Sequence, residues 1–298
     1  MKDIVYYEID EAFKIHHVKG REIIDSRGRP TVEAEVSTVG GGVGVAAVPA
    51  GASKGRHEAW ELRDGDSRFF GLGVRKAVEN INTLISKEIV GLDSRHQREI
   101  DNRMISLDGT PNKSKLGANA ILAVSIATSK AAADTYGLPL FKYWGGHLAR
   151  TLPTPFLNII NGGKHAGNEL SIQEFMIVPG GADGFSEALR MACEVYYKLK
   201  EFLKEKYGLQ AVNVGDEGGF APPMSKSRDA LDALVRAIKM AGYVDGSDVA
   251  IAIDAAASSF YDESKMKYFI DGKYVDPDDL LEYYVDLIEE YPIVSIED

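Results

Sequence analysis

The chain has 298 residues, of which 45% are hydrophobic and 27% are charged, as is typical of a globular protein with a sizeable core and about two domains. The net charge of −11 disfavours nucleic acids and anionic membranes as partners. The single cysteine, Cys193, cannot form an internal disulfide, and the start MKDIVYYEID lacks the apolar segment of a secretory signal. The most membrane-like stretch, LGANAILAVSIATSKAAA, is too short and too rich in Ala and Ser to span a bilayer. We therefore expect a cytoplasmic protein without a membrane span.

The first half of the chain predicts strands followed by helices. Residues 31–38 alternate between apolar and polar side chains, as a half-buried strand does, and 16–25 and 43–50 complete a three-stranded meander. Helical patterns follow at 72–90, 94–105 and 116–136. This order predicts a compact α+β domain over residues 1–148, with the proline-rich TLPTP segment as a candidate linker.

The second half, 149–298, predicts alternating strands and helices. The expected strands are 156–160, 174–179, 209–214, 249–254 and 292–297, and the expected helices are 185–207, 229–241 and 278–291. Such alternation predicts a parallel sheet, either open or closed into a barrel. Only the loop NGGKHAGNELSIQ joins the first two strands, so these two should form an antiparallel hairpin.

Two acidic residues are expected at the ends of neighbouring strands. Asp254 ends one predicted strand and Glu297 ends the next, one strand-helix-strand step later. In a β/α barrel the chemistry lies at the carboxyl ends of the strands, and Mg²⁺ prefers oxygen ligands. The pair therefore outlines a site for a hard cation. The alternative is that acidic residues end strands simply because the loops that follow are solvated.

Further polar side chains are predicted at the same edge of the sheet. Asn161, Lys164 and His165 follow the first strand of the hairpin, and Glu174 begins its returning strand. Glu217, in the glycine-rich segment GDEGG, follows another predicted strand. Two carboxyl groups in one pocket cannot both ionise cheaply, so one becomes a candidate general acid. A solvated turn at GDEGG and an ordinary loop histidine at position 165 are the competing interpretations.

One loop of the first domain is also a candidate. The segment PAGASKGRHEAWELRDGD contains small residues that suit a mobile lid, which could bring the hydroxyl of Ser53 to a metal ion or a phosphate. It does not match the P-loop pattern G-x-x-x-x-G-K-[ST].

These segments together resemble the enolase (phosphopyruvate hydratase) family. The resemblance is carried by DSRGRPTVE, PAGASKGRHEAWELRDGD, SLDGTPNKSKLGANAILAVS, NIINGGKHAGNELSIQEFMIVP, NVGDEGGFAP and YPIVSIED, in the family's order from about Val18 onward. The chain departs from the family pattern at Arg29, where Asn is common, and in an extra leading segment. The resemblance implies a glycolytic lyase that reversibly dehydrates 2-phosphoglycerate to phosphoenolpyruvate with two Mg²⁺ ions, and a homodimer or larger homo-oligomer.

The resemblance also assigns roles to six residues. Asp254 and Glu297 match the first two carboxylate ligands of the tighter Mg²⁺, and Ser53 matches the lid residue that joins the second ion. Glu217 matches the acid that helps the hydroxyl leave, and Glu174 matches its carboxylate partner. Together with Ser53 and Glu174, His165 matches the groups that contact the substrate.

A complete barrel takes about 250 residues, so the resemblance implies a barrel that is incomplete in this chain. The base lysine and the third metal ligand of the family have no counterpart here, and the 298-residue chain alone is expected to be inactive. Two alternatives stay open at this point. One is a non-catalytic enolase-like binding protein; the other is a different enzyme of the enolase superfamily, such as a racemase or an acid-sugar dehydratase.

Overall fold

The computed structural model describes residues 9–51, 55, 57–163, 166–215 and 217–298, in two compact units, Met1–Arg150 and Thr151–Asp298. Each unit has its own hydrophobic core. Among the described residues, every helix is too short or too polar to cross a bilayer.

The sheet of the first unit is the predicted meander. Strands β1 (Ile15–Ile24), β2 (Pro30–Thr38) and β3 (Val43–Val48) pair antiparallel in the order β1-β2-β3. Buried and exposed positions alternate strictly along β3, because one face of the sheet packs on helices and the other does not. The three-stranded meander is therefore confirmed.

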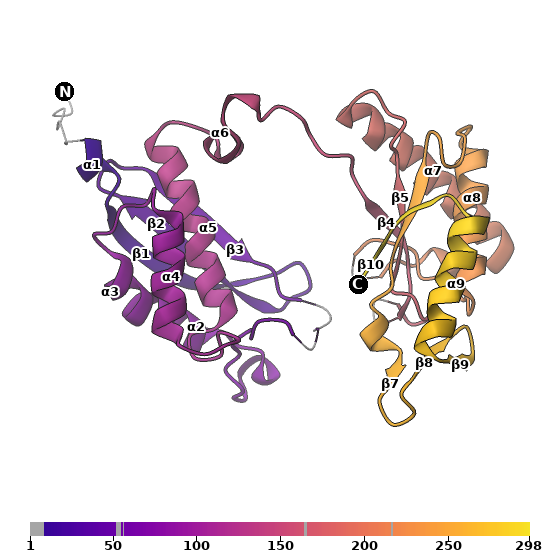
Figure 1. Cartoon of the computed structure of the whole chain (residues 1–298), viewed down its shortest axis with the longest axis horizontal. Helices are drawn as coiled ribbons and strands as arrows, with labels where there is room; N and C mark the ends of the chain where they lie inside the picture. The colour runs from indigo at the N-terminus through magenta and orange to yellow at the C-terminus, as the bar shows by residue number, and fades with distance from the viewer. Residues whose placement is uncertain (1–8, 52–54, 56, 164–165, 216) are drawn as a thin grey trace. The chain divides into compact units, whose positions relative to one another are not determined.

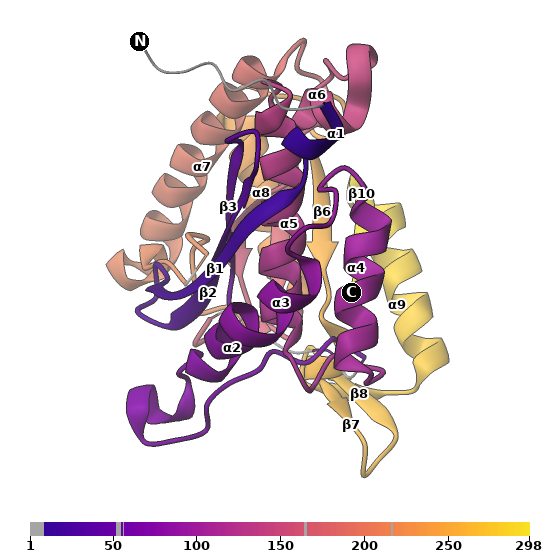
Figure 2. The same ribbon diagram turned by 90° about the vertical axis from the view of Figure 1, so that its left-hand side faces the viewer.

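Helix α5 (Ala118–Thr135) packs along the buried face of this sheet, as Figures 1 and 2 show. The approach is close at Gly44 of β3, where the Cβ atom of any larger residue would lie 2.0 Å from the carbonyl oxygen of Ala127. Glycine at that position lets the strand and the helix touch. The other helices of the unit are α1 (Ile9–Ala12), α2 (Arg75–Asn80), which continues through a π-turn (Ile81–Ile85) into α3 (Ser86–Ile89), α4 (Gln97–Asp108) and α6 (Leu140–Gly145).

The second unit contains a four-stranded sheet in the order β10-β6-β5-β4. Its strands are β4 (Leu157–Asn161), β5 (Glu174–Val178), β6 (Ala250–Asp254) and β10 (Ile293–Glu297). β4 and β5 pair antiparallel, as the short loop between them predicted, and β6 and β10 pair parallel. The described strands thus form an open sheet, which confirms an incomplete barrel.

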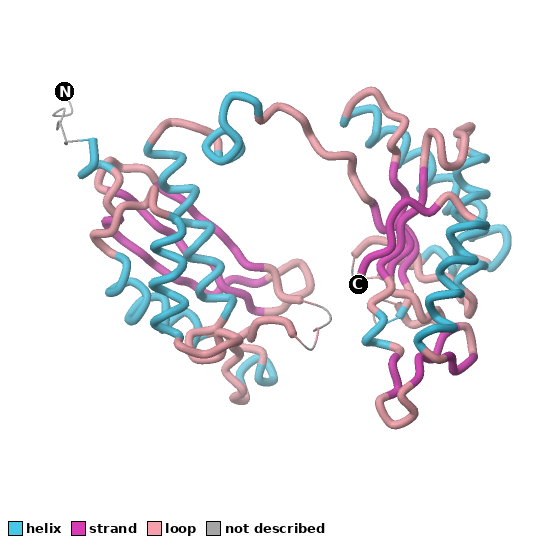
Figure 3. Tube along the Cα trace, in the orientation of Figure 1, coloured by secondary structure: helices cyan, strands magenta, loops and turns pink. Residues whose placement is uncertain are grey.

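Helices α7 (Phe185–Tyr207), α8 (Ser227–Met240) and α9 (Pro277–Glu290) lie on one side of this sheet (Figures 1 and 3). Phe175 of β5 and Ile253 of β6 are register partners, and both belong to the core that these helices cover. The next pair along the strands, Met176 and Ala252, belongs to a separate small cluster on the opposite face. The two faces of the sheet therefore have different neighbours.

One predicted strand is wrong. Residues 209–214 contain a 3₁₀ turn (Leu209–Val212), and Val214 makes only an isolated bridge to Phe220. Gly208, with a φ of 87°, ends α7 just before this turn, and the chain meets β4 only later, where Phe220 forms an isolated parallel bridge with Ile160. A second sheet was not predicted: β7 (Tyr261–Asp262), β8 (Lys267–Ile270) and β9 (Lys273–Val275) form a small antiparallel meander after β6.

Candidate active site

Four polar residues form one row across the sheet of the second unit. Asn161 at the end of β4 is the register partner of Glu174 at the start of β5. Glu174 is in turn the partner of Asp254, and Asp254 is the partner of Glu297. Register partners point to the same face of a sheet, and this face carries Met176 and Ala252 rather than the helix-covered core. The prediction that Asp254 and Glu297 lie on neighbouring strands, at the same end of the sheet, is confirmed.

The row concentrates negative charge around Glu174. Partial burial, a hydrogen bond with Glu217, and the charges of Glu217, Asp254 and Glu297 raise the pKa of Glu174 from 4.5 to about 8. The Glu174 carboxyl group therefore holds its proton to a higher pH than an ordinary glutamate does. The sequence predicted that two carboxyl groups would be close here, and the contact between Glu174 and Glu217 confirms their proximity.

Glu217 reaches this place from a loop that is anchored on both sides. The nitrogen of Gly215 donates to the oxygen of Gly219 at 2.9 Å, which closes the GDEGG turn. The ring of Tyr196 stacks on Phe220 with centroids 4.4 Å apart, and the Tyr196 hydroxyl donates to the Gly218 oxygen at 3.0 Å. The turn is thus held against α7, which supplies Tyr196, while Glu217 and Gly218 themselves are exposed to solvent.

Glycine at position 219 is needed for this arrangement. A Cβ atom there would lie 2.4 Å from the side-chain oxygen of Asn161. Asn161 cannot easily move, because it is fully buried and its backbone nitrogen donates to the oxygen of Phe220 at 2.8 Å. The GDEGG turn and the end of β4 therefore fit together only with glycine at the contact.

The backbone after β6 fixes the carboxylate of Asp254. Ala256 has a left-handed conformation with a φ of 45°, and its nitrogen donates to Asp254 Oδ1 at 3.0 Å. The nitrogen of Ala255 donates to the carbonyl oxygen of Glu297 at 2.9 Å. A non-glycine residue in this conformation is strained, and such strain gathers at functional sites. The turn holds one oxygen of Asp254 and ties the ends of β6 and β10 together.

Asp254 and Glu297 are the described residues that suit a divalent cation. Both present carboxylate oxygens at one edge of one face, and their negative charges contribute, after burial and Glu217, to the raised pKa of Glu174. Among the described residues, no group of three or more His, Cys, Asp or Glu side chains could hold a metal ion by itself. This donor set fits Mg²⁺, which commonly uses one or two carboxylates and completes its shell with water and substrate oxygens.

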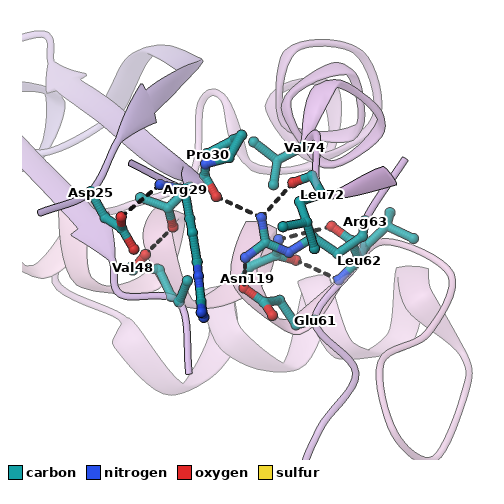
Figure 4. Close-up of polar contacts among 12 residues, drawn as sticks. Asp25, Arg29, Pro30, Val48, Glu61, Leu62, Arg63, Leu72, Val74 and Asn119 are labelled. Carbon is teal, nitrogen blue, oxygen red and sulfur yellow. Dashed lines mark hydrogen bonds and ion pairs between the residues drawn. The ribbon is translucent and has the colours of Figure 1, made fainter. Parts of the chain in front are cut away.

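The described residues that follow the Ser53 segment make several polar contacts within the first unit, as Figure 4 shows for Leu62 and Arg63. The guanidinium group of Arg63 donates to the carbonyl oxygens of Pro30 at 2.5 Å and Leu72 at 2.6 Å. The side chain of Asn119 bonds both backbone groups of Leu62 at 3.1 Å. Ser53 itself lies outside the described residues, as do Lys164 and His165, so their predicted roles stay predictions.

Asn158 is a residue near the row that the sequence did not single out. Its side-chain nitrogen lies 2.7 Å from Asn161 Oδ1 and 3.3 Å from Glu217 Oε2. Simple alternation along a strand would place residues 158 and 161 on opposite faces, so no sequence pattern pointed to this contact.

The fold and the carboxylate row define a protein of two units, whose second unit presents acidic groups at the strand ends of an incomplete barrel. Residues 15–144 match the family model described as "Enolase, N-terminal domain", and residues 149–298 match "Enolase, C-terminal TIM barrel domain". The chain is 60% identical to the enolase of Methanocaldococcus jannaschii and 58% identical to that of Thermococcus kodakarensis. Both alignments cover 97% of this chain, and they cover 68% and 67% of the respective relatives. The chain belongs to the enolase family.

Proposed function

We propose that this chain forms part of the active site of a glycolytic lyase that reversibly dehydrates 2-phosphoglycerate to phosphoenolpyruvate with Mg²⁺. The observation that carries the proposal is the row of register partners Glu174, Asp254 and Glu297, with Glu217 bonded to Glu174. The high identity to curated enolases supports it, and neither alternative, the binding protein or a different superfamily enzyme, gains support from these relatives.

The proposed chemistry assigns the two bonded carboxyl groups to the leaving hydroxyl. The reaction removes a proton from carbon 2 and the hydroxyl from carbon 3 of the substrate. Glu217 gives a proton to that hydroxyl, which departs as water, and Glu174 holds Glu217 through their hydrogen bond. The raised pKa of Glu174 supports this step, because the pair then retains a proton that their shared hydrogen bond can pass to Glu217 as Glu217 gives its own to the hydroxyl.

Membership of the family implies a divalent metal cofactor, and we propose that it is Mg²⁺. Asp254 and Glu297 would hold one ion through their carboxylate oxygens, and Ser53 is the proposed protein ligand of a second. Bound Mg²⁺ would supply positive charge that stabilises the negative charge developed by the substrate. His165 is proposed to contact the substrate. The base is proposed to be a lysine, and the inactivity of the isolated 298-residue chain stays a prediction.

The proposal is tested with the full-length native protein. Conversion of 2-phosphoglycerate should be followed by the ultraviolet absorbance of the enol phosphate product, with Mg²⁺ and then with EDTA in excess. We expect turnover that EDTA abolishes and added Mg²⁺ restores. No turnover at saturating Mg²⁺ would refute the proposed reaction. A sizing column on the same sample tests the proposed homo-oligomer, and fractionation of the source cells tests the proposed cytoplasmic location.

A further inference from the structure

We propose that Asn158 is a positioning residue for Glu217, and that an irregularity in β4 exists to place it there. The inference rests on the proposed function, because it concerns the group assigned to the leaving hydroxyl. Asn158 is the register partner of Met176 rather than of a proposed metal ligand, and it would act on the reaction through Glu217.

The irregularity in β4 decides where Asn158 points. Asn158 is the register partner of Met176, and Asn161 is the partner of Glu174, but the register shifts between residues 158 and 160. Three residues along a regular strand change face, whereas one extra residue in a β-bulge restores the face. Both asparagine side chains therefore point to the face that carries the carboxylates.

The amide group of Asn158 has two N–H donors, and the structure gives each an acceptor. Nδ2 lies 2.7 Å from Asn161 Oδ1 and 3.3 Å from Glu217 Oε2. The first bond stays within β4, as that of a structural asparagine could. The second is directed at the carboxyl group that we assign to the reaction, and it is made to a side chain rather than to backbone.

The anchor behind Asn158 is rigid. Asn161 is fully buried, its nitrogen donates to the oxygen of Phe220 at 2.8 Å, and its backbone oxygen accepts from Asn168 Nδ2 at 3.0 Å. Asn161 therefore fixes Asn158, and Asn158 fixes one oxygen of Glu217. Glu217 also bonds Glu174, so the two contacts together set the orientation of the Glu217 carboxyl group.

The experiment is a double-mutant cycle in the full-length native protein. Asn158→Leu removes the donor at similar volume, and Glu217→Gln removes the proposed acid. We expect Asn158→Leu to lower kcat by about tenfold, as for a lost hydrogen bond to a charged group, and to leave KM within about twofold. In the Glu217→Gln background the same substitution should change kcat by less than about twofold, because the group through which it acts is already gone.

Two further variants keep the test decisive. If Asn158→Leu does not fold, Asn158→Asp retains the shape and replaces the amide by a carboxylate. That carboxylate would repel Glu217, so Tm should fall, and adding Glu217→Gln should restore at least half of the loss.

Tyr243→Phe is the matched control, because it also removes a donor to a carboxylate, that of Glu194 on α7. Its kcat should stay within about twofold of the wild type.

The outcomes separate the inference from the proposed function. A wild-type protein that does not dehydrate 2-phosphoglycerate would refute the proposed function, and the inference with it. An active wild type whose kcat is insensitive to Asn158→Leu would overturn the inference alone. The same holds if the substitution lowers kcat by an equal factor with and without Glu217, since a purely structural role predicts that result.

Discussion

Substitution of Glu174 by Gln should stabilise the metal-free protein, and the gain should grow with pH. The pKa of Glu174 is raised from 4.5 to about 8 by partial burial, by the hydrogen bond with Glu217 and by the neighbouring carboxylates. Below about pH 4.5 the group is protonated in both the folded and the unfolded states, so it contributes nothing. Between about 4.5 and 8 the unfolded chain releases the proton while the folded chain keeps it. Folding stability therefore falls across that window and levels off above it.

The size of the effect can be bounded. A pKa raised from 4.5 to about 8 corresponds to at most about 5 kcal/mol, at about 1.4 kcal/mol per pH unit. Glu174 is only half-buried, and solvent screens its charge, so about 1–2 kcal/mol is the reasonable expectation. For a domain of this size that is a gain in Tm of about 3–6 °C.

The assay is thermal unfolding of the wild type and Glu174→Gln in EDTA, at pH 5, 6.5 and 8. The Tm difference should be small at pH 5 and largest at pH 8, and Mg²⁺ should shrink it, because a bound cation offsets the same negative charge. Glu187→Gln is the control: Arg190 lowers the pKa of the exposed Glu187, so its removal should give no gain as pH rises. A Tm gain that is equal at pH 5 and pH 8, or a loss at pH 8, would contradict the assigned charge cluster.

Three further substitutions test the site in the full-length protein. Glu217→Gln should keep Mg²⁺ affinity by calorimetry but lose about 10²-fold or more in turnover, and unchanged turnover would remove Glu217 from its role. Asp254→Ala should weaken Mg²⁺ binding, so activity should fall and partly return at high Mg²⁺; a wild-type Mg²⁺ titration curve would refute the ligand assignment. Gly219→Ala should cost about 1–3 kcal/mol in denaturant unfolding, because its Cβ would lie 2.4 Å from Asn161 Oδ1; an unchanged unfolding midpoint would show that this contact relaxes freely.

The parts of the fold that the sequence predicted well are those in which periodicity and burial agree. The long helix Phe185–Tyr207 was predicted with the bounds that the structure has, because its apolar residues recur on one face over many turns. The strand expected at 209–214 failed because a short apolar run says nothing about pairing. The missed hairpin between β8 and β9 did have a signal: Asp271 and Gly272 both have positive φ, and Asp-Gly is the dipeptide that such turns favour.

Some contacts in the candidate site could be predicted from the sequence and others could not. The proximity of Asp254 and Glu297 could be predicted from their positions at the ends of successive strands, since parallel neighbours present their carboxyl ends at one edge. The contact of Asn158 with Glu217 depends on a register shift of one residue in β4. Whether a strand carries a bulge is decided by its partners in the sheet, and a single strand's sequence does not contain that information.

The carboxylate row lowers the folding stability of the sheet. Like charges on directly opposed residues destabilise a strand pair, yet Glu174 faces Asp254, and Asp254 faces Glu297. The strained turn at Ala256 adds to that cost while it fixes one oxygen of Asp254. A sheet selected only to fold would replace at least one of these groups by a neutral side chain, as in Glu174→Gln. The row is therefore best explained by a bound cation and substrate, whose interactions offset in the working enzyme what the carboxylates cost in the metal-free chain.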